Sequence, residues 1–424
     1  MFSQISSMCF SRRHFLASSA AAVTALSMGA LSRRAQAQTV ASGRRFLFVT
    51  ADGGWDPLCV FAPMYDATSI DMEAESQRMQ IGNLSLVDHP GRPAVRRFFE
   101  RYGSQSLVFN GLSVRSVNHE TCMAVALTGS TSDTRPDWAT LLAADARSTY
   151  DLPHVVFSGP VFTGPHNVLV SRAQGDLARL IDGRLYADSE PAVEPLSSPA
   201  ARMVDRFLER RSQGLLAGGA VPESGARQLR DLAESNARAR RLSDARYEIN
   251  LQSGFTPAAQ ARTAVDTLAK GLCRCASVAT GGWDTHEDNS EQIGLFEGLF
   301  SGLEEIMSLL ARTMGPEGRP LAEDTVVVVV SEMSRTPAYN ETRGRDHWPY
   351  TTAMIVGPGV TGDRMVGQYD DGFLGLGVDL ATGELDRSKA GIAAEDFGAT
   401  LLALGDVDPQ SVLPRARPIT GVLR

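Results

Sequence analysis

Four apolar runs constrain the fold of this chain more than any other feature of its sequence. Residues 326–330 are five consecutive valines, and residues 44–51, 106–112 and 352–359 contain similar runs rich in branched or aromatic side chains. Runs without polar alternation are typical of strands that are covered on both faces. Residues 295–313 repeat apolar side chains every three and four positions, as an amphipathic helix does. The sequence therefore predicts an α/β fold in which helices cover both faces of a largely parallel central sheet.

A different pattern occupies residues 200–272, which are rich in Arg, Ala, Glu and Leu at helical spacing and carry almost no strand signal. We expect these residues to form a helical insertion between elements of the sheet. Two arrangements remain open, namely a cap over the functional site and a plain helical face of the core. The chain has 424 residues and no solenoid-type repeat, and we expect residues 38–424 to form a single domain.

The N-terminus has the pattern of an export signal. Arg12 and Arg13 precede an Ala-rich apolar stretch, and residues 35–37 read Ala-Gln-Ala, an A-x-A cleavage site. This resembles a twin-arginine (Tat) signal peptide covering residues 1–37, which predicts export through the Tat translocon to the periplasm or beyond. A short membrane anchor is the alternative, but the stretch is rich in Ala and Ser and ends in a cleavage site, so we expect no stable membrane span.

Charge and cysteine usage exclude several classes of partner and site. The net charge is -8, from 41 basic and 49 acidic residues, which provides no basic face for nucleic acid or for an anionic membrane. An anionic substrate would therefore need a local positive centre, which a metal ion can provide. Cys273 and Cys275 lack C-x-x-C spacing, so we expect these two cysteines to be buried or disulfide-bonded thiols rather than metal ligands.

Polar side chains cluster where the predicted strands end, and ligands of α/β proteins bind outside the carboxyl ends of the strands. These candidates are Asp52 and Asp56 after the first run, Asp284 and His286 after residues 275–283, Glu332 and Arg335 after the valines, and Asp346 and His347 in a loop before the last run. Asp284 and His286 would point to one side of an extended segment. Imidazole with carboxylate suits Zn²⁺ first, then Mn²⁺ or Fe, with Mg²⁺ or Ca²⁺ at carboxylate-rich positions.

Each of these pairs also has a purely structural interpretation. Asp284 and His286 can belong to a capped turn, Glu332 can simply pair with Arg335, and the aspartates near Gly53 can be turn formers. Their joint occurrence at strand ends is what favours a site with one or two divalent metal ions.

The segment Asn118-His119-Glu120-Thr121-Cys122 is expected to begin a helix after the second run, where free N–H groups favour a bound anion. Asn118 can be an ordinary N-cap. Thr121 or Cys122 can be a nucleophile, with Thr121 slightly preferred, or a water activated by metal can attack instead. His154 and His166 have no clear partners and are interpreted as structural.

Taken together, five segments resemble the DUF1501 family: TADGGWDPLCVFAP, NHETCMAVALTGS, GGWDTHEDN, the stretch from VVVVSEMSRTP through GRDHWP to GDRMVGQ, and DFGATLLALGDVDP. That family is commonly exported by Tat and is placed in the alkaline phosphatase and sulfatase superfamily. The resemblance implies an alkaline phosphatase-like three-layer sandwich with one or two metals at the strand ends. It also implies hydrolysis or transfer of phosphate or sulfate esters, in small-molecule or polymeric substrates.

Carried over onto matching positions, Asp284 and His286 look like ligands of one metal, and Asp346 and His347 like the Asp-His pair of the other. Asp52 looks like the first-strand aspartate, although the Gly-Gly-x-Asp pattern ending at Asp56 matches the family better, so we keep both as candidates.

The chain also departs from the superfamily pattern. It lacks the cysteine motif of formylglycine sulfatases, and no histidine follows His347, which leaves His119 as the best replacement for a late histidine ligand. The sequence thus predicts an exported metal-dependent ester hydrolase in which Arg335 adds a positive charge for the anion. The alternative is a non-catalytic metal-binding protein of the cell envelope that keeps the same fold.

Overall fold

The computed structural model describes residues 43–173, 198–219, 221–244 and 256–424, which fall into two units. The larger unit spans residues 40–175 and 250–424, and the smaller unit includes residues 176–249. Residues 1–37, where we predict the signal peptide, lie outside the described residues. Within the described residues, no helix has an apolar stretch that is long enough to cross a membrane.

An eight-stranded sheet forms the centre of the larger unit. Its strand order is β12 (Arg364–Val366), β4 (Ser106–Ser113), β11 (Tyr350–Val356), β8 (Thr325–Ser331), β1 (Arg45–Ala51), β7 (Cys275–Thr280), β5 (His154–Val156) and β6 (Val170–Arg172). β11 pairs antiparallel with both of its neighbours, β4 and β8, whereas the other pairings in the sheet are parallel. The predicted largely parallel sheet is confirmed.

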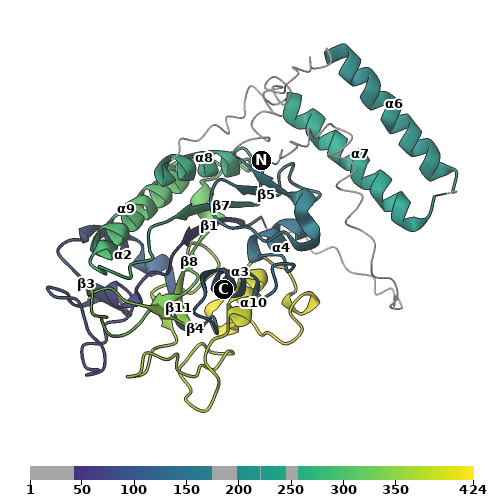
Figure 1. Ribbon diagram of the computed structural model, residues 1–424. Coiled ribbons are helices and arrows are strands. Elements are labelled where there is room, and N and C mark those ends of the chain that lie inside the picture. The colour runs from purple at the N-terminus through teal and green to yellow at the C-terminus, as the bar shows by residue number, and fades with distance from the viewer. Residues whose placement is uncertain (1–42, 174–197, 220, 245–255) are drawn as a thin grey trace, which may run out of the picture. The chain divides into compact units, whose positions relative to one another are not determined.

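Helices cover both faces of this sheet (Figure 1). One face carries α2 (Pro93–Tyr102), α8 (Pro257–Ala269) and α9 (Glu291–Arg312), and the other carries α3 (His119–Thr128), α4 (Trp138–Asp145) and α10 (Ala394–Leu404). α9 packs against α2 and α8, while α10 packs against α3 and α4. The three layers confirm the predicted α/β fold class, and the predicted amphipathic helix over residues 295–313 is α9.

The central strands are apolar because both of their faces are covered. Every residue of β1 and β8 is buried, and the five valines of residues 326–330 are at most 2% exposed. Burying a valine side chain contributes roughly 1.5–3 kcal/mol, so these five residues alone make β8 a strong anchor of the sheet. The buried strand therefore fixes the position of the next residue, Glu332.

The direction of the strands brings the polar loops to one edge of the sheet. β1, β7 and β8 are parallel neighbours, so their carboxyl ends, at Ala51, Thr280 and Ser331, lie at the same edge. β4 also ends there, because it is separated from β8 by the reversed strand β11. β11 begins at this edge, which places the loop before Tyr350 beside the four strand ends.

Two short antiparallel ladders accompany the sheet. β2 (Gln77–Ile81) pairs with β3 (Leu84–Asp88), and β9 (Ser334–Arg335) pairs with β10 (His347–Trp348). The second ladder joins the loop after β8 to the loop before β11, with Arg335 opposite His347.

Helices fill the range 200–272 wherever it is described. α6 (Ser198–Ala217) and α7 (Glu223–Asp244) pack against each other and belong to the smaller unit. α8 belongs to the larger unit and packs against β7 and α9. The last part of this range is therefore a helical layer of the sheet rather than part of the separate helical unit.

Candidate metal centre

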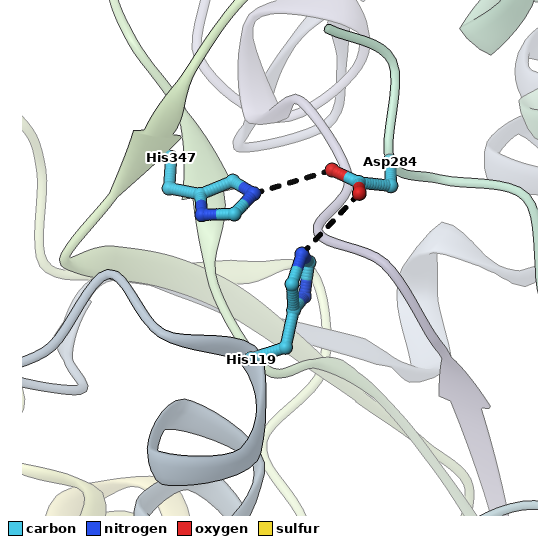
Figure 2. Close-up of side chains that lie close together, drawn as sticks. All are labelled: His119, Asp284 and His347. Atoms are coloured by element: carbon cyan, nitrogen blue, oxygen red, sulfur yellow. Dashed lines mark hydrogen bonds and ion pairs between the residues drawn. The ribbon is translucent and has the colours of Figure 1, made fainter.

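Three histidines and one aspartate converge at the edge of the sheet where the strand ends meet. His119 is the first residue of α3, Asp284 and His286 lie in the loop after β7, and His347 begins β10. The potential ligand atoms of His119, Asp284 and His347 all lie within 4.8 Å of one another (Figure 2). The structure therefore brings together residues that are as much as 228 positions apart in the sequence (119 to 347).

Asp284 is the shared partner of the three imidazoles. Its Oδ1 lies 3.0 Å from His286 Nε2 and 3.2 Å from His347 Nε2. Its Oδ2 lies 3.5 Å from His119 Nε2. Residues 284–286 form a loop instead of the extended segment assumed from the sequence, and yet the aspartate and histidine side chains converge.

The other ring nitrogen of each histidine faces a hydrogen-bond acceptor. Nδ1 lies 2.9 Å from Glu332 Oε1 in His119, 2.9 Å from Asp346 Oδ1 in His286 and 2.7 Å from the Val117 carbonyl oxygen in His347. A carbonyl oxygen or an ionised carboxylate accepts but does not donate, so each Nδ1 carries the proton. In the neutral form of each ring, Nε2 then presents a lone pair toward Asp284.

The three Nε2 lone pairs and the Asp284 carboxylate are all acceptors, so without additional protons they cannot hydrogen-bond to one another. His286 Nε2 and His347 Nε2 lie 2.9 Å apart, and the buried His119 Nε2 has no hydrogen-bond partner. A proton shared by His286 and His347 would satisfy that pair, but it would leave His119 Nε2 unpartnered. A divalent cation can accept all of these lone pairs together.

The spacing of the ligand atoms also fits a cation. Zn–N and Zn–O bonds of about 2.0–2.1 Å at angles between 90° and the tetrahedral value place neighbouring ligand atoms about 2.9–3.4 Å apart. The distances among Asp284, His286 and His347 are 2.9, 3.0 and 3.2 Å. A histidine whose far nitrogen donates to a carboxylate or carbonyl is the common arrangement of metal-ligating imidazoles. The residues present therefore fit a transition-metal ion such as zinc.

Charges at the site shift the proton affinities of its members. Partial burial raises the pKa of Asp284, but the hydrogen bond from Arg335 and the neighbouring His347 outweigh it and lower that pKa to about 2. The hydrogen bond to Glu332 raises the pKa of His119. Burial raises the pKa of Asp52, the negative charge of Glu332 raises it further, and the charge of His119 opposes that rise. Asp52 is thus electrostatically linked to the cluster, as expected for the residue that follows β1.

Burial and hydrogen bonds hold the Glu332 side chain in one position. It is 0% exposed, its Oε1 also accepts a hydrogen bond from the Gly53 N–H at 2.8 Å, and its Oε2 lies 3.0 Å from Ser331 Oγ. His119 is held from its other side because Asn118 caps α3, accepting a hydrogen bond from the backbone N–H of Thr121 at 3.0 Å. The strand β8 and the helix α3 therefore determine where the His119 ring lies.

Asp56, a predicted metal ligand, contacts a different set of residues. It is 0% exposed, and its Oδ2 lies 3.1 Å from Arg345 Nε and 2.9 Å from Asn289 Nδ2. Its Oδ1 accepts from the Leu58 N–H at 3.0 Å, so it also caps a short helix. The structure therefore places Asp56 in a buried ion pair with Arg345 rather than in contact with the imidazoles.

The two predicted nucleophiles differ in their surroundings. Thr121 is half-buried in the first turn of α3, and its hydroxyl has no hydrogen-bond partner within the described residues. Cys122 is buried, and that burial raises its pKa to about 11, which keeps the thiol protonated near neutral pH. Thr121 is thus the freer of the two groups to meet a ligand.

The other cysteines and His154 lie in the core. Cys59, Cys273 and Cys275 are free and buried. For Cys273 and Cys275 this agrees with the expectation of buried thiols, and no disulfide forms within the described residues. His154 is buried in β5, with ring nitrogens 3.1 Å from Thr140 Oγ1 and 2.8 Å from Ser277 Oγ, in keeping with a structural role.

Sequence reasoning missed two buried residues that support the centre. Arg345 stacks on the ring of Tyr339 at 4.1 Å and pairs with Asp56. The Nε2 of Gln292 donates to the carbonyls of Gly54 and Trp283 at 3.2 and 3.1 Å, respectively. Arg345 could have been suspected from the sequence, because it directly precedes Asp346 and His347. Gln292 could not, because nothing in the sequence of α9 distinguishes it from a surface residue.

Comparisons with known proteins give a match to a family model. The model of one family, described as a protein of unknown function (DUF1501), matches residues 104–419. Among curated proteins, none matches the sequence.

Several solved structures are similar in fold. They include a lipoteichoic acid synthase, LtaP, from Listeria monocytogenes (TM-score 0.40, 10% identity, covering 90% of this chain and 77% of that one). A putative sulfatase from Bacteroides thetaiotaomicron has a TM-score of 0.38 and 9% identity, with coverage of 89% and 76%. A protein in the alkaline phosphatase superfamily from Vibrio parahaemolyticus has a TM-score of 0.37 and 10% identity, with coverage of 97% and 79%. At these scores and identities, the likeness carries no argument about activity or ligands.

Proposed function

The chain belongs to the DUF1501 family, and from that premise we propose that it is an exported, metal-dependent hydrolase of a phosphate or sulfate ester. One observation carries the proposal. Three imidazole nitrogens face one carboxylate, and each ring is oriented by an acceptor on its far nitrogen. This arrangement suits a divalent cation better than it suits a network of hydrogen bonds.

The proposed ligands are His119, His286 and His347 through Nε2, together with Asp284. Glu332 and Asp346 orient two of the rings, and Asp52 provides a further carboxylate nearby. Zinc is the first candidate because imidazole and carboxylate ligands at this spacing suit it, while manganese, iron, magnesium and calcium are to be tested beside it. When bound, the ion would supply Lewis-acid polarisation of an ester oxygen and would favour a deprotonated nucleophile.

The anionic group of the substrate would meet positive potential from α3. This helix begins at His119, so the free N–H groups of its first turn and its dipole face the cluster. Arg335 is 0% exposed and already bonded through each of its nitrogens. The metal and the helix terminus, rather than an arginine, would therefore stabilise charge on the transferred group.

Thr121 is the proposed nucleophile, since it lies in the same first turn of α3 and its hydroxyl is not engaged by other described residues. The hydroxyl also has no hydrogen bond to any residue of the cluster. That second fact favours the alternative function, a non-catalytic metal-binding protein of the cell envelope. If a water molecule is the nucleophile instead, the enzyme does not require the Thr121 hydroxyl.

Export is proposed on the twin-arginine pattern of residues 1–37, and a periplasmic or extracellular location follows from it. The substrate class is an anionic ester, either a small molecule or a polymer. Neither nucleic acid nor a membrane is expected as a partner, because the chain carries a net charge of -8.

Metal content and ester hydrolysis, measured on protein exported by its own host, test the proposal. We expect about one or two metal ions per chain, removal by chelation, and loss of metal in Asp284→Ala and His347→Ala. A panel of aryl phosphates and sulfates then separates the two functions. Hydrolysis that is lost in Thr121→Ala supports the enzyme and its nucleophile, and hydrolysis kept in that variant supports water as the nucleophile. Bound metal without hydrolysis supports the non-catalytic protein, and metal-free wild type overturns the proposal.

A further inference from the structure

We propose that Arg335 is a positioning residue, which locks three loops together and holds Asp284 in place as a metal ligand. This inference rests on the metal centre of the proposed function and concerns this chain's own residues around it. It replaces the role expected from the sequence, in which Arg335 would bind the substrate anion directly.

The guanidinium of Arg335 is surrounded by acceptors from the protein itself. Nε donates to the Gly54 carbonyl at 2.8 Å and Nη1 to the Arg345 carbonyl at 3.2 Å. Nη2 contacts the carbonyls of Gly53 and Trp283, the latter at 3.0 Å, and Asp284 Oδ1 at 2.7 Å. Because the side chain is 0% exposed and every nitrogen is bonded, it has little capacity left for a substrate group.

These contacts connect three loops that supply or support the cluster. Gly53 and Gly54 follow β1, Trp283 and Asp284 follow β7, and Arg345 precedes β10. Arg335 itself follows β8 and is paired with His347 in the small ladder. One side chain therefore joins the backbones of the loops on which Asp284 and His347 lie.

The ion pair also determines how the Asp284 carboxylate is oriented. Oδ1 accepts from Arg335 and faces His286 and His347, whereas Oδ2 faces His119 at 3.5 Å. Because the same oxygen contacts Arg335 and two imidazoles, any rotation that moved it away from the imidazoles would also break the contact with Arg335.

The glycines after β1 permit this close approach of loops. Gly53 has φ +123°, and a Cβ there would lie 2.7 Å from the backbone nitrogen of Asp284. Gly54 has φ +84°, and a Cβ there would lie 2.9 Å from Met333 Cγ and 3.2 Å from Arg335 Nη2. Any larger residue at either position would push the turn away from Asp284 or from the arginine.

The chain offers a matched control in Arg274. This arginine is also 0% exposed, with Nη1 2.7 Å from the Leu142 carbonyl and 3.1 Å from Asp145 Oδ2, and Nη2 2.6 Å from the Gly405 carbonyl. It precedes β7, at the edge of the sheet opposite the metal centre. Arg274 therefore has the same kind of structural environment and no contact with a proposed ligand.

The test compares zinc affinity and the free energy of unfolding of the metal-free protein in Arg335→Lys and Arg274→Lys of the full mature chain. Zinc alone is the probe, competed against a chromophoric chelator of known affinity. We expect both variants to lose stability, but only Arg335→Lys to bind zinc at least about tenfold more weakly, as supporting residues around metal ligands usually do. Equal zinc affinity in wild type and Arg335→Lys would overturn the inference, as would an equal loss in Arg274→Lys.

A second variant covers the case in which Arg335→Lys does not fold. Gly54→Ala keeps the arginine but presses on its Nη2, and we expect a loss of zinc affinity in the same direction. Unchanged affinity in that variant then counts against the inference. Wild type that binds zinc without hydrolysing any ester would leave the role of Arg335 standing and remove the proposed enzyme. Wild type without zinc or another divalent ion would remove both.

Discussion

The contact between Glu332 and His119 leads to a prediction that isolates one charge. Glu332→Gln keeps the length and shape of the side chain. Its amide oxygen can still accept from His119 Nδ1 and the Gly53 N–H, which contact Glu332 Oε1 at 2.9 and 2.8 Å. Its amide nitrogen can donate to Ser331 Oγ, because that hydroxyl has the Ala51 carbonyl at 2.7 Å to receive its own proton. The variant should therefore fold and lose only the negative charge behind the imidazole.

The expected magnitude follows from the loss of that charge. A carboxylate behind a ligating imidazole increases its basicity, and removing such a partner typically weakens metal binding about 10- to 100-fold. Because glutamine keeps the hydrogen bonds, we expect the lower end, about tenfold or 1.4 kcal/mol. Glu332→Ala also leaves the N–H groups of Gly53 and of the half-buried His119 ring without their acceptor and frees that ring, so we expect about 100-fold weaker zinc binding, or about 2.7 kcal/mol.

The assay is zinc competition at a pH above the raised pKa of His119, with denaturant unfolding of the metal-free proteins measured alongside. Asp324→Asn is the matched control. Asp324 precedes β8 at its other end, is 3% exposed and pairs with Arg45 at 2.8 Å. This control should lose stability and keep its zinc affinity. The reasoning is refuted by Glu332 variants that bind zinc like wild type, or by a loss in Asp324→Asn as large as that in Glu332→Gln.

Three further predictions concern protons, a buried ion pair and the thiols. Protons and metal compete for the same imidazole lone pairs, and Glu332 raises the pKa of His119. Zinc affinity should therefore be highest above that pKa and fall as the pH decreases through it. Zinc titrations between about pH 5.5 and 8.5 that show constant affinity would contradict this prediction. Asp56→Asn leaves the charge of Arg345 buried without its counterion, which should lower the free energy of unfolding by about 3–5 kcal/mol. Zinc affinity should change far less, and the reverse pattern in denaturation and competition experiments would restore Asp56 as a ligand. The thiols of four buried cysteines should react with iodoacetamide only after denaturation, because burial raises their pKa; the four are Cys59, Cys122, Cys273 and Cys275. Labelling of the native protein, detected by mass spectrometry, would contradict this prediction.

The fold and the membership of DUF1501 were predictable because they depend on local patterns. The runs at residues 44–51, 106–112, 326–330 and 352–359 are the strands β1, β4, β8 and β11. The helix expected to begin in the segment 118–122 is α3, which ends before Gly129, a glycine in the left-handed conformation at φ 68°. Apolar runs and glycine punctuation are properties of short segments, so the sequence displays them directly.

Side-chain pairing was harder to predict, because it depends on contacts between distant segments. Asp52 and Asp56 are equally plausible ligands in the sequence, and they differ only because Arg345, 289 positions after Asp56, takes up the second aspartate. Arg335 looks available for an anion until the carbonyls of three other loops are placed around it. Local patterns could name the candidates at the strand ends, but the choice among them required the packing of the loops.

The reversed direction of β11 makes the cluster possible, and the sequence did not reveal it. If β11 ran parallel to β8, the segment before Tyr350 would start at the opposite edge of the sheet, and His347 would lie a full strand length away from Asp284. Because β11 is antiparallel, that segment instead lies beside the ends of β1, β7 and β8. The ladder of β9 with β10 then fixes His347 opposite Arg335, which in turn is bonded to Asp284. The chain thus assembles its centre from four strand ends and one strand beginning, so substitutions that weaken the ladder should disturb the His347 ligand before they disturb the sheet.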